Sequence, residues 1–201
     1  MNNKFKLALA IVSVSFLAAC GGGGSSGSST AVNPLQKYEG TYYVCDSSGH
    51  TKKTVTVTST GSNSVTASQV QQIYQNINCS GPVVGTYSES GSITASYTSQ
   101  TTANFPRVTI MPASDTVDSV NFSAPAMTMQ LVGSGVSGSC VAYTGGRTCY
   151  DTFSAPAQVV NGAFYLRGNY FVTLSLQNGV LVSNGIASKD PMFSFNMLIP
   201  N

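Results

Sequence analysis

The sequence predicts an all-β protein, and three features of the chain point to that class. Apolar and polar residues alternate with a period of two in several short segments rich in Val, Thr and Tyr. Asn-Gly pairs separate apolar runs towards the C-terminus, which is a strong hairpin signal. Beyond the N-terminal region, the pattern supports about ten strands by these criteria. Because the hairpins follow one another along the chain, we expect a single antiparallel β-barrel built as a meander, with a β-sandwich as the second choice.

The N-terminal residues have the organisation of an export signal. Lys4 and Lys6 precede an apolar stretch at 7–19, which ends in small residues directly before Cys20. This stretch is shorter than the roughly 20 residues that a membrane-spanning helix requires. We therefore predict that residues 1–19 are a signal peptide that is removed.

The residues Leu17, Ala18, Ala19 and Cys20 resemble the lipobox of bacterial lipoproteins. This resemblance implies cleavage before Cys20 and attachment of a diacylglycerol to its sulfur, usually with a further acyl chain such as palmitate. Because glycine rather than aspartate follows the cysteine, the resemblance also implies the outer membrane, with the side on which the protein lies left open. The membrane, reached through the lipid at Cys20, is then the first expected partner.

The rest of the chain divides into a tether and one domain. Residues 20–34 are rich in Gly and Ser and form the expected flexible tether, and 35–201 form the expected β domain. Charged residues make up only 8% of the chain. Without Lys4 and Lys6, seven basic residues face seven acidic ones and no basic cluster occurs, which argues against nucleic acid as a partner.

The four cysteines after Cys20 predict two disulfide bonds, because an even number is typical of exported chains. Four cysteines allow three pairings, of which we favour Cys45–Cys79 and Cys140–Cys149. The second pair flanks a hairpin-like stretch whose turn would place the two residues side by side. A zinc site is the alternative, but the chain contains no Cys-x-x-Cys and a single histidine, so we expect no metal.

The strands are expected in the following order along the chain. The alternating segments of the first two thirds lie at 38–45, 54–58, 93–98 and 127–131. The segment at 68–78 fits a helix by the spacing of its apolar residues and a strand by the need for Cys79 to reach Cys45; we lean towards the strand. The Gly-rich stretch at 133–138 precedes no helix and is expected to be a flexible loop at the rim.

The last third contains three Asn-Gly pairs that we interpret as turns. Asn161-Gly162 and Asn178-Gly179 each separate two apolar runs, and Asn184-Gly185 marks a further turn. The chain is then expected to close the meander with a strand at 193–199.

The segment at 38–45 also resembles the opening strand of lipocalin-like barrels, in which a Gly-x-Trp motif occurs. Gly40 and Tyr42 occupy the corresponding positions here, with tyrosine in place of tryptophan. The resemblance implies a cavity for a small apolar ligand inside the barrel.

Few residues are suited to catalysis. His50 is the only histidine, and its neighbours Asp46, Ser47 and Ser48 indicate a polar turn rather than a catalytic triad. Asp115 and Asp118 are expected in a solvated turn. A carboxylate pair would have to be drawn from Glu39, Asp46, Glu89, Asp115, Asp118, Asp151 and Asp190.

These observations leave three function classes. We predict a non-enzymatic envelope lipoprotein whose β domain binds a partner or has a structural role, with no cofactor and no catalytic residue. The alternative is a lipocalin-like carrier of a small apolar ligand, which requires a cavity of several hundred Å³. An envelope hydrolase is the third class and requires His50 or a close carboxylate pair in a cleft. Exposed tyrosines are further candidates for recognition, drawn from Tyr42, Tyr43, Tyr143, Tyr150, Tyr165 and Tyr170.

Overall fold

The computed structural model describes residues 32–46, 49–105, 111–150, 157–177 and 180–195. The chain divides into the units Met1–Thr30 and Ala31–Asn201, and all described residues belong to the second. These residues form strands and one short 3-10 helix, η1 (Gln36–Tyr38), which confirms the all-β class. None of them lies in a helix with the length and apolar character needed to cross a membrane. The expected signal peptide and Cys20 lie outside the described residues.

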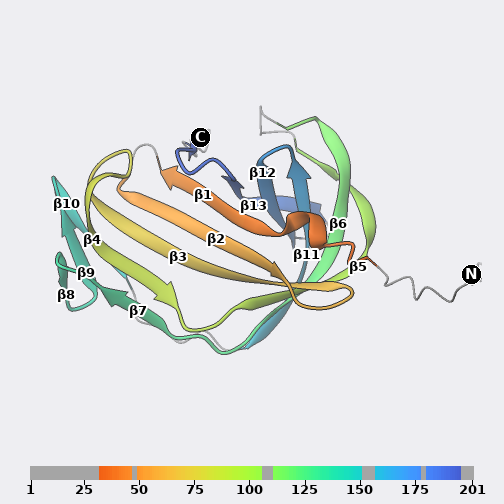
Figure 1. The fold of residues 1–201 in the computed structure, drawn as a ribbon, viewed down its shortest axis with the longest axis horizontal. Coiled ribbons are helices and arrows are strands. Elements are labelled where there is room, and N and C mark those ends of the chain that lie inside the picture. Colours follow the sequence, from red (N-terminus) through yellow and green to blue (C-terminus); the bar gives the residue numbers. More distant parts are fainter. Residues whose placement is uncertain (1–31, 47–48, 106–110, 151–156, 178–179, 196–201) are drawn as a thin grey trace, which may run out of the picture. The chain divides into compact units, whose positions relative to one another are not determined.

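Eight strands pair with one another in a closed antiparallel ring (Figure 1). The order around the ring is that of the chain, apart from the strands inserted between its members. The ring is closed where Tyr43 pairs with Ser188. Its members are β1 (Gly40–Asp46), β2 (Thr51–Ser59), β3 (Ser64–Asn76), β5 (Ile93–Asn104), β6 (Ser114–Ala124), β11 (Gln158–Arg167), β12 (Tyr170–Gln177) and β13 (Val180–Ser188).

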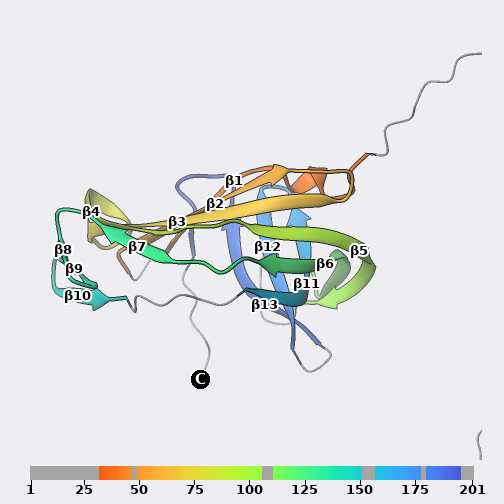
Figure 2. The same cartoon turned by 90° about the horizontal axis from the view of Figure 1, so that it is seen from below.

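The inserted strands build a lateral extension beside the ring. β3 is long enough to pair with β5 through its first residues and with β4 (Ser80–Glu89) through its later ones. β7 (Met129–Val132) pairs with β4, and a separate three-stranded sheet follows, as Figure 2 shows from below. This small sheet consists of β8 (Val136–Ser137), β9 (Cys140–Tyr143) and β10 (Gly146–Cys149). The buried residues Ile73, Tyr87 and Val141 form the apolar core of the extension.

The segment at 68–78 is a strand for most of its length, as favoured from the sequence. Within β3, Val65 and Ile73 are buried, whereas Val70 in the strand and Ile77 just after it, which would complete an apolar helix face, are exposed. The stretch at 133–138, expected as a flexible loop, contains the two-residue strand β8 and contacts the backbone of β4. Gly135 donates a backbone hydrogen bond to Val84 O (2.8 Å), and a side chain at Gly133 would collide with the backbone of Val84 and Gly85. Glycine is needed there because two backbones approach closely.

Two of the three Asn-Gly turn predictions are wrong. Asn161 and Gly162 lie within β11, where a side chain on Gly162 would collide with the carbonyl oxygen of Leu174 and the ring of Phe122. Glycine therefore makes room for an aromatic ring on the neighbouring strand. Asn184 and Gly185 lie within β13 at an irregularity in its pairing with β12, which is a β-bulge.

The third Asn-Gly prediction is consistent with the strand pairing, because Gln177 at the end of β12 pairs with Val180 at the start of β13. The two residues between them lie outside the described residues. A tight turn that the sequence analysis missed joins β11 to β12 through Gly168 and Asn169, with Gly168 in the left-handed region at φ 57°.

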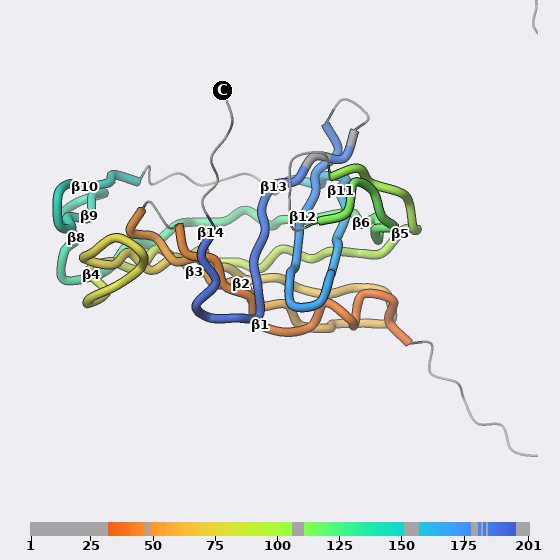
Figure 3. The backbone as a smooth tube through the Cα atoms, turned by 90° about the horizontal axis from the view of Figure 1, so that it is seen from above, coloured from red at the N-terminus to blue at the C-terminus, as the bar shows by residue number. Residues whose placement is uncertain are grey.

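The closing strand also differs from the prediction. β14 (Ser194–Phe195) is short and pairs in parallel with the end of β1, next to β13 (Figure 3). The ring is closed by β13 instead. β13 pairs with β1 at Tyr43, ahead of the residues of β1 that pair with β14. Asp190 turns the chain between the two strands by accepting a hydrogen bond from Met192 N (2.9 Å). Residues 196–199 of the expected strand lie outside the described residues.

The N-terminal end of the described chain plugs one end of the ring. Leu35, Tyr38 and Tyr42 are fully or almost fully buried in the core inside the ring. Asn33, expected in the tether, is buried and donates hydrogen bonds to Ser59, Gly61 and Ser64 at the β2–β3 hairpin. The folded unit therefore includes Asn33, and the side chains of this segment close the ring at that end.

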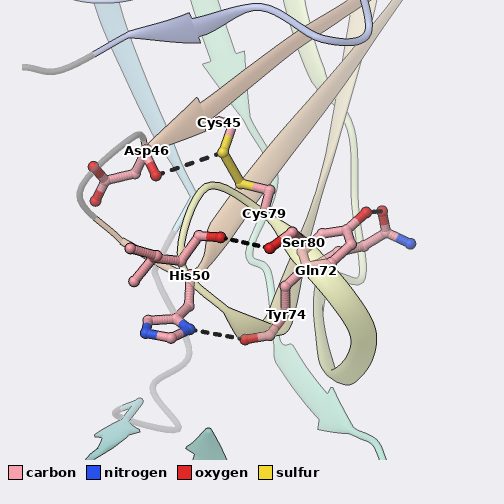
Figure 4. The surroundings of a disulfide bond; sticks show 8 residues. Cys45, Asp46, His50, Gln72, Tyr74, Cys79 and Ser80 are labelled. Carbon is pink, nitrogen blue, oxygen red and sulfur yellow. Dashed lines mark hydrogen bonds between the residues drawn. A yellow bond between two sulfur atoms is a disulfide. The ribbon is translucent and has the colours of Figure 1, made fainter. Parts of the chain in front are cut away.

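Both favoured disulfides are confirmed. Cys45 at the end of β1 is bonded to Cys79, which follows β3, with their Cα atoms 6.0 Å apart (Figure 4). Cys140 and Cys149 face each other across the β9–β10 hairpin. The first disulfide joins the ring to the start of the lateral extension, and the second lies within the extension.

Candidate ligand cavity

The ring encloses a cavity of about 830 Å³ that is partly open to solvent. All eight ring strands contribute to its lining, together with β4 and β14. Binding pockets for small molecules usually have about 300–1,000 Å³. The cavity therefore has the size that the ligand-carrier hypothesis requires.

The inward-facing side chains of neighbouring strands form successive layers around the cavity, because every second residue of a strand faces inward. At the plugged end, Tyr42, Val57 and Val65 are buried and leave no space. The inward-facing residue two positions along β1 is Val44, and that on β2 is Val55; both line the cavity. Small and aromatic side chains complete this apolar layer. They are Ala67, Ala95, Phe122, Ala124, Phe164, Phe171 and Ala187.

Two residues further along the same strands, the lining becomes polar. Asp46 follows Val44 on β1, Lys53 precedes Val55 on β2, and Gln69 follows Ala67 on β3. The polar layer also contains Gln71, Glu89 and Gln158. The cavity thus changes from apolar to polar and charged along the axis of the ring.

Lys53 and Glu89 dominate the electrostatics of the polar layer. Both side chains are partly buried. Burial raises the pKa of Glu89, and the positive charge of Lys53 acts in the opposite direction. In the part of the chain that the structure describes, neither residue forms a salt bridge. A bound molecule would therefore meet the cationic side chain of Lys53 and the acidic side chains of Glu89 and Asp46.

Lys53 and Glu89 were not identified from the sequence as ligand-binding residues. A signal for Lys53 is present, because it has the same parity in its strand as Val55 and Val57, which face inward. The adjacent Lys52 has the opposite parity and lies over the ring of Tyr43, with Nζ 5.1 Å from the centroid. No comparable signal exists for Glu89, because the extension that carries β4 was not predicted.

His50 has a structural environment rather than the neighbours of a catalytic base. Its Nδ1 lies 3.0 Å from the carbonyl oxygen of Tyr74, and its ring stacks on Tyr143 at a centroid distance of 3.9 Å. Figure 4 shows the carboxylate of Asp46 pointing away from the imidazole. Asp46 and His50 are therefore close in sequence, but their functional groups are not brought together. The hydroxyls of Ser47 and Ser48 lie outside the described residues.

Asp115 and Asp118 do not lie in a solvated turn, so that prediction is wrong. Both are on β6, where Asp115 accepts a hydrogen bond from the hydroxyl of Tyr165 (2.7 Å). Asp118 is buried, and its carboxylate accepts hydrogen bonds from Tyr38 (2.6 Å) and Gln100 (3.0 Å). Burial tends to raise the pKa of Asp118, but these bonds and the ammonium of Lys37 lower it overall. Asp118 thus fastens the N-terminal plug to the ring.

The remaining candidates are dispersed. Glu39 accepts a hydrogen bond from Ser59 N (3.2 Å), Asp190 shapes the turn before β14, and Asp151 lies outside the described residues. Over the described ranges, no three residues of the types His, Cys, Asp and Glu are grouped so that they could hold a metal ion.

The tyrosines considered for recognition mostly pack within the fold. Tyr42 and Tyr165 are buried, and burial raises the pKa of each to about 12. Tyr150 stacks on Tyr87, and Tyr170 packs edge-on against Phe193. They do not form one exposed recognition face.

Comparison with known proteins matched no protein family, no curated protein and no solved structure. The lipoprotein and lipocalin-like resemblances therefore stay predictions, and the cavity provides the main structural argument about function.

Proposed function

We propose that this protein is a lipid-anchored envelope protein whose β domain holds a small, largely apolar ligand in the cavity of the ring, without catalysing a reaction. The observation that carries this proposal is the apolar middle layer of the cavity. Protein interiors are normally packed to the density of organic crystals, so a space of about 830 Å³ with one apolar layer in its lining is unusual for a purely structural domain.

The space arises from specific residues. Ala67, Ala95 and Ala187 are among the lining residues, so the side chains of three strands are small at this level of the ring. The neighbouring layer towards the plugged end, with Tyr42 and Val57, is closely filled. The small side chains at these three positions support a binding cavity at this level of the ring.

The test measures binding of single-chain amphiphiles to the full chain carrying Cys20→Ser, which avoids detergent. Below their micelle-forming concentrations, each added methylene is expected to improve the Kd about fourfold, because burying it contributes about 0.8 kcal/mol. Ala67→Phe should place a ring in the apolar layer of the cavity, obstruct the hydrocarbon chain and weaken binding at least about tenfold. The matched control is Val70→Phe, which makes a similar change on the exposed side of the same strand.

Two outcomes would contradict the cavity proposal. One is the absence of saturable binding for every chain length. The other is equal binding by the Ala67→Phe and Val70→Phe variants when both have the wild-type melting temperature.

Attachment through Cys20 is the second part of the proposal, supported by the residues that precede it. Cys20→Ser is expected to abolish labelling with radioactive palmitate and to leave an unprocessed precursor or release the protein from the membrane fraction. Two or more acyl chains make release negligible, whereas a single chain binds only marginally. Unchanged palmitate labelling of the variant would contradict the anchor.

The disulfides support an envelope location. Disulfide bonds persist in oxidising compartments and are rare in the bacterial cytosol. With Gly21 rather than an aspartate after Cys20, we place the protein at the outer membrane. Protease accessibility on intact cells would determine which side of that membrane the domain faces.

A further inference from the structure

We infer that the ligand is a single-chain amphiphile with a zwitterionic head group, bound with its hydrocarbon chain in the apolar layer and its two charges against Lys53 and Glu89. This inference rests on the proposed function and specifies the class of ligand. The same chemistry is found in any single-chain lipid with a phosphate and an amine in its head group.

The layered lining supports an amphiphile rather than a wholly apolar molecule. Along β2, the inward-facing residues run from buried Val57 through Val55 to Lys53. Along β3, they run from buried Val65 through Ala67 to Gln69. A wholly apolar ligand that filled the cavity would remove water from Lys53 and the glutamines without offering them a hydrogen bond, which is unfavourable. A ligand with a polar end satisfies both layers.

Lys53 and Glu89 are placed in the sheet so that one head group can lie near both of their charges. Lys53 pairs with Gln71 on β3, and Val70 on β3 pairs with Ser88, the residue before Glu89 on β4. The cation and the carboxylate therefore lie on either side of β3, close enough for the charge of Lys53 to influence the pKa of Glu89. A head group that settles between them is exposed to charges of both signs.

A zwitterion suits this pair better than a singly charged head group. A fatty-acid anion would pair with Lys53 but would add a negative charge to a lining that already contains Glu89 and Asp46. An alkyl ammonium would pair with Glu89 and leave Lys53 desolvated beside a like charge. Desolvated charges are strongly unfavourable without a partner. A zwitterionic head group, which offers a partner to both Lys53 and Glu89, should therefore bind more tightly than a singly charged one.

The experiment compares three probes with the same twelve-carbon chain by calorimetry, again with the full chain carrying Cys20→Ser. The probes are dodecylphosphocholine, dodecanoate and dodecyltrimethylammonium, each below its micelle-forming concentration. We expect dodecylphosphocholine to bind about tenfold more tightly than either singly charged probe, since hydrogen bonds and ion pairs to charged groups are worth this much.

Matched variants identify the residues responsible. Lys53→Met should weaken dodecylphosphocholine binding about tenfold, whereas Lys52→Met, the same change on the opposite face of β2, should leave it unchanged. Glu89→Gln should also weaken binding, with Glu39→Gln as its exposed control. Melting temperatures of all four variants establish that they are folded.

The outcomes separate this inference from the proposed function. Equal affinity for the three probes, tightest binding of dodecanoate, or the same effect from Lys52→Met and Lys53→Met would overturn the zwitterion inference and leave the cavity proposal standing. If none of the probes binds, the proposed function itself fails.

Discussion

Replacing Asp118 with alanine is expected to lower the free energy of unfolding by about 2–4 kcal/mol, because the substitution removes a buried acceptor that Tyr38, Gln100 and Lys37 share. The carboxylate is the acceptor for the hydroxyl of Tyr38 and the amide of Gln100, and it lies 2.6 Å from the ammonium of Lys37. The hydroxyl of Tyr38 also lies 2.9 Å from the carbonyl oxygen of Phe164. The alanine variant therefore loosens the plug from β6, while the carbonyl oxygen of Phe164 on β11 is still available to the hydroxyl of Tyr38.

The same residue predicts a dependence of stability on pH. The pKa of Asp118 is lower in the folded protein than its ordinary value, since its hydrogen bonds and Lys37 together outweigh burial. The stabilisation is therefore fully present above the unfolded pKa of about 4 and is lost as the pH falls through the folded value. The pKa of Asp115 is lowered as well, chiefly by the hydrogen bond from Tyr165, so it contributes in the same direction.

Asp115→Ala is the matched control, because it removes a carboxylate from an exposed position on the same strand. Urea denaturation at neutral pH should show a smaller loss of stability for Asp115→Ala than for Asp118→Ala. Tyr38→Phe, which removes one partner of Asp118 and keeps the ring, should fall between the two alanine variants. Equal stabilities of the Asp115→Ala and Asp118→Ala variants would contradict the conclusion that Asp118 holds the N-terminal segment against the ring.

Asp118 was expected in a turn because the local sequence does not indicate that its side chain is buried. Asp115 and Asp118 frame a short polar stretch, which is typical of an exposed turn. In the fold, Val117 and Asp118 are neighbours on β6 and both are buried, on opposite faces. A strand covered on both faces loses the alternation that marks a half-exposed strand. The partner that stabilises the buried carboxylate, Tyr38, is eighty residues away in the chain.

The Asn-Gly pairs fail for a related reason. Asn-Gly favours a tight turn because both residues readily adopt positive φ. At Gly162, however, the glycine is required because Phe122 packs over the strand, which depends on the neighbouring strand rather than on the local sequence. The existence of strands was predictable because alternation marks them, and the disulfide pairing was predictable because Cys140 and Cys149 flank a hairpin, which leaves Cys45 and Cys79 as the other pair. The lateral extension was not, since its pairing depends on how β3 is shared between two partners.

The cavity was predictable only as an implication of the lipocalin-like resemblance at 38–45. Its lining includes alanines at 67, 95 and 187, which come from three separate strands. Single alanines in alternating segments carry no signal of a shared space. By contrast, the inward position of Lys53 follows from its parity with Val55 and Val57, so a charged residue on an apolar strand face is the signal to follow in similar sequences.

The Cys45→Ala/Cys79→Ala double variant is expected to lose about 3–4 kcal/mol of unfolding free energy as an upper estimate, because its disulfide closes a loop with a sequence separation of 34. The disulfide also holds an unusual backbone. Asn78 and Cys79 have φ of 56° and 49°, a region that L-residues rarely occupy. Without the disulfide, this segment can relax and release the end of β1.

Two controls make this prediction specific. The Cys140→Ala/Cys149→Ala variant should lose less, about 2.5–3 kcal/mol at most, because its sequence separation is only 9. His50→Ala, beside the first disulfide, should lose about 1 kcal/mol through its stacking on Tyr143 and its contact with Tyr74. Urea denaturation of the oxidised proteins tests this order. If His50→Ala is as destabilising as the Cys45→Ala/Cys79→Ala variant, the first disulfide does not stabilise the junction between the ring and the extension.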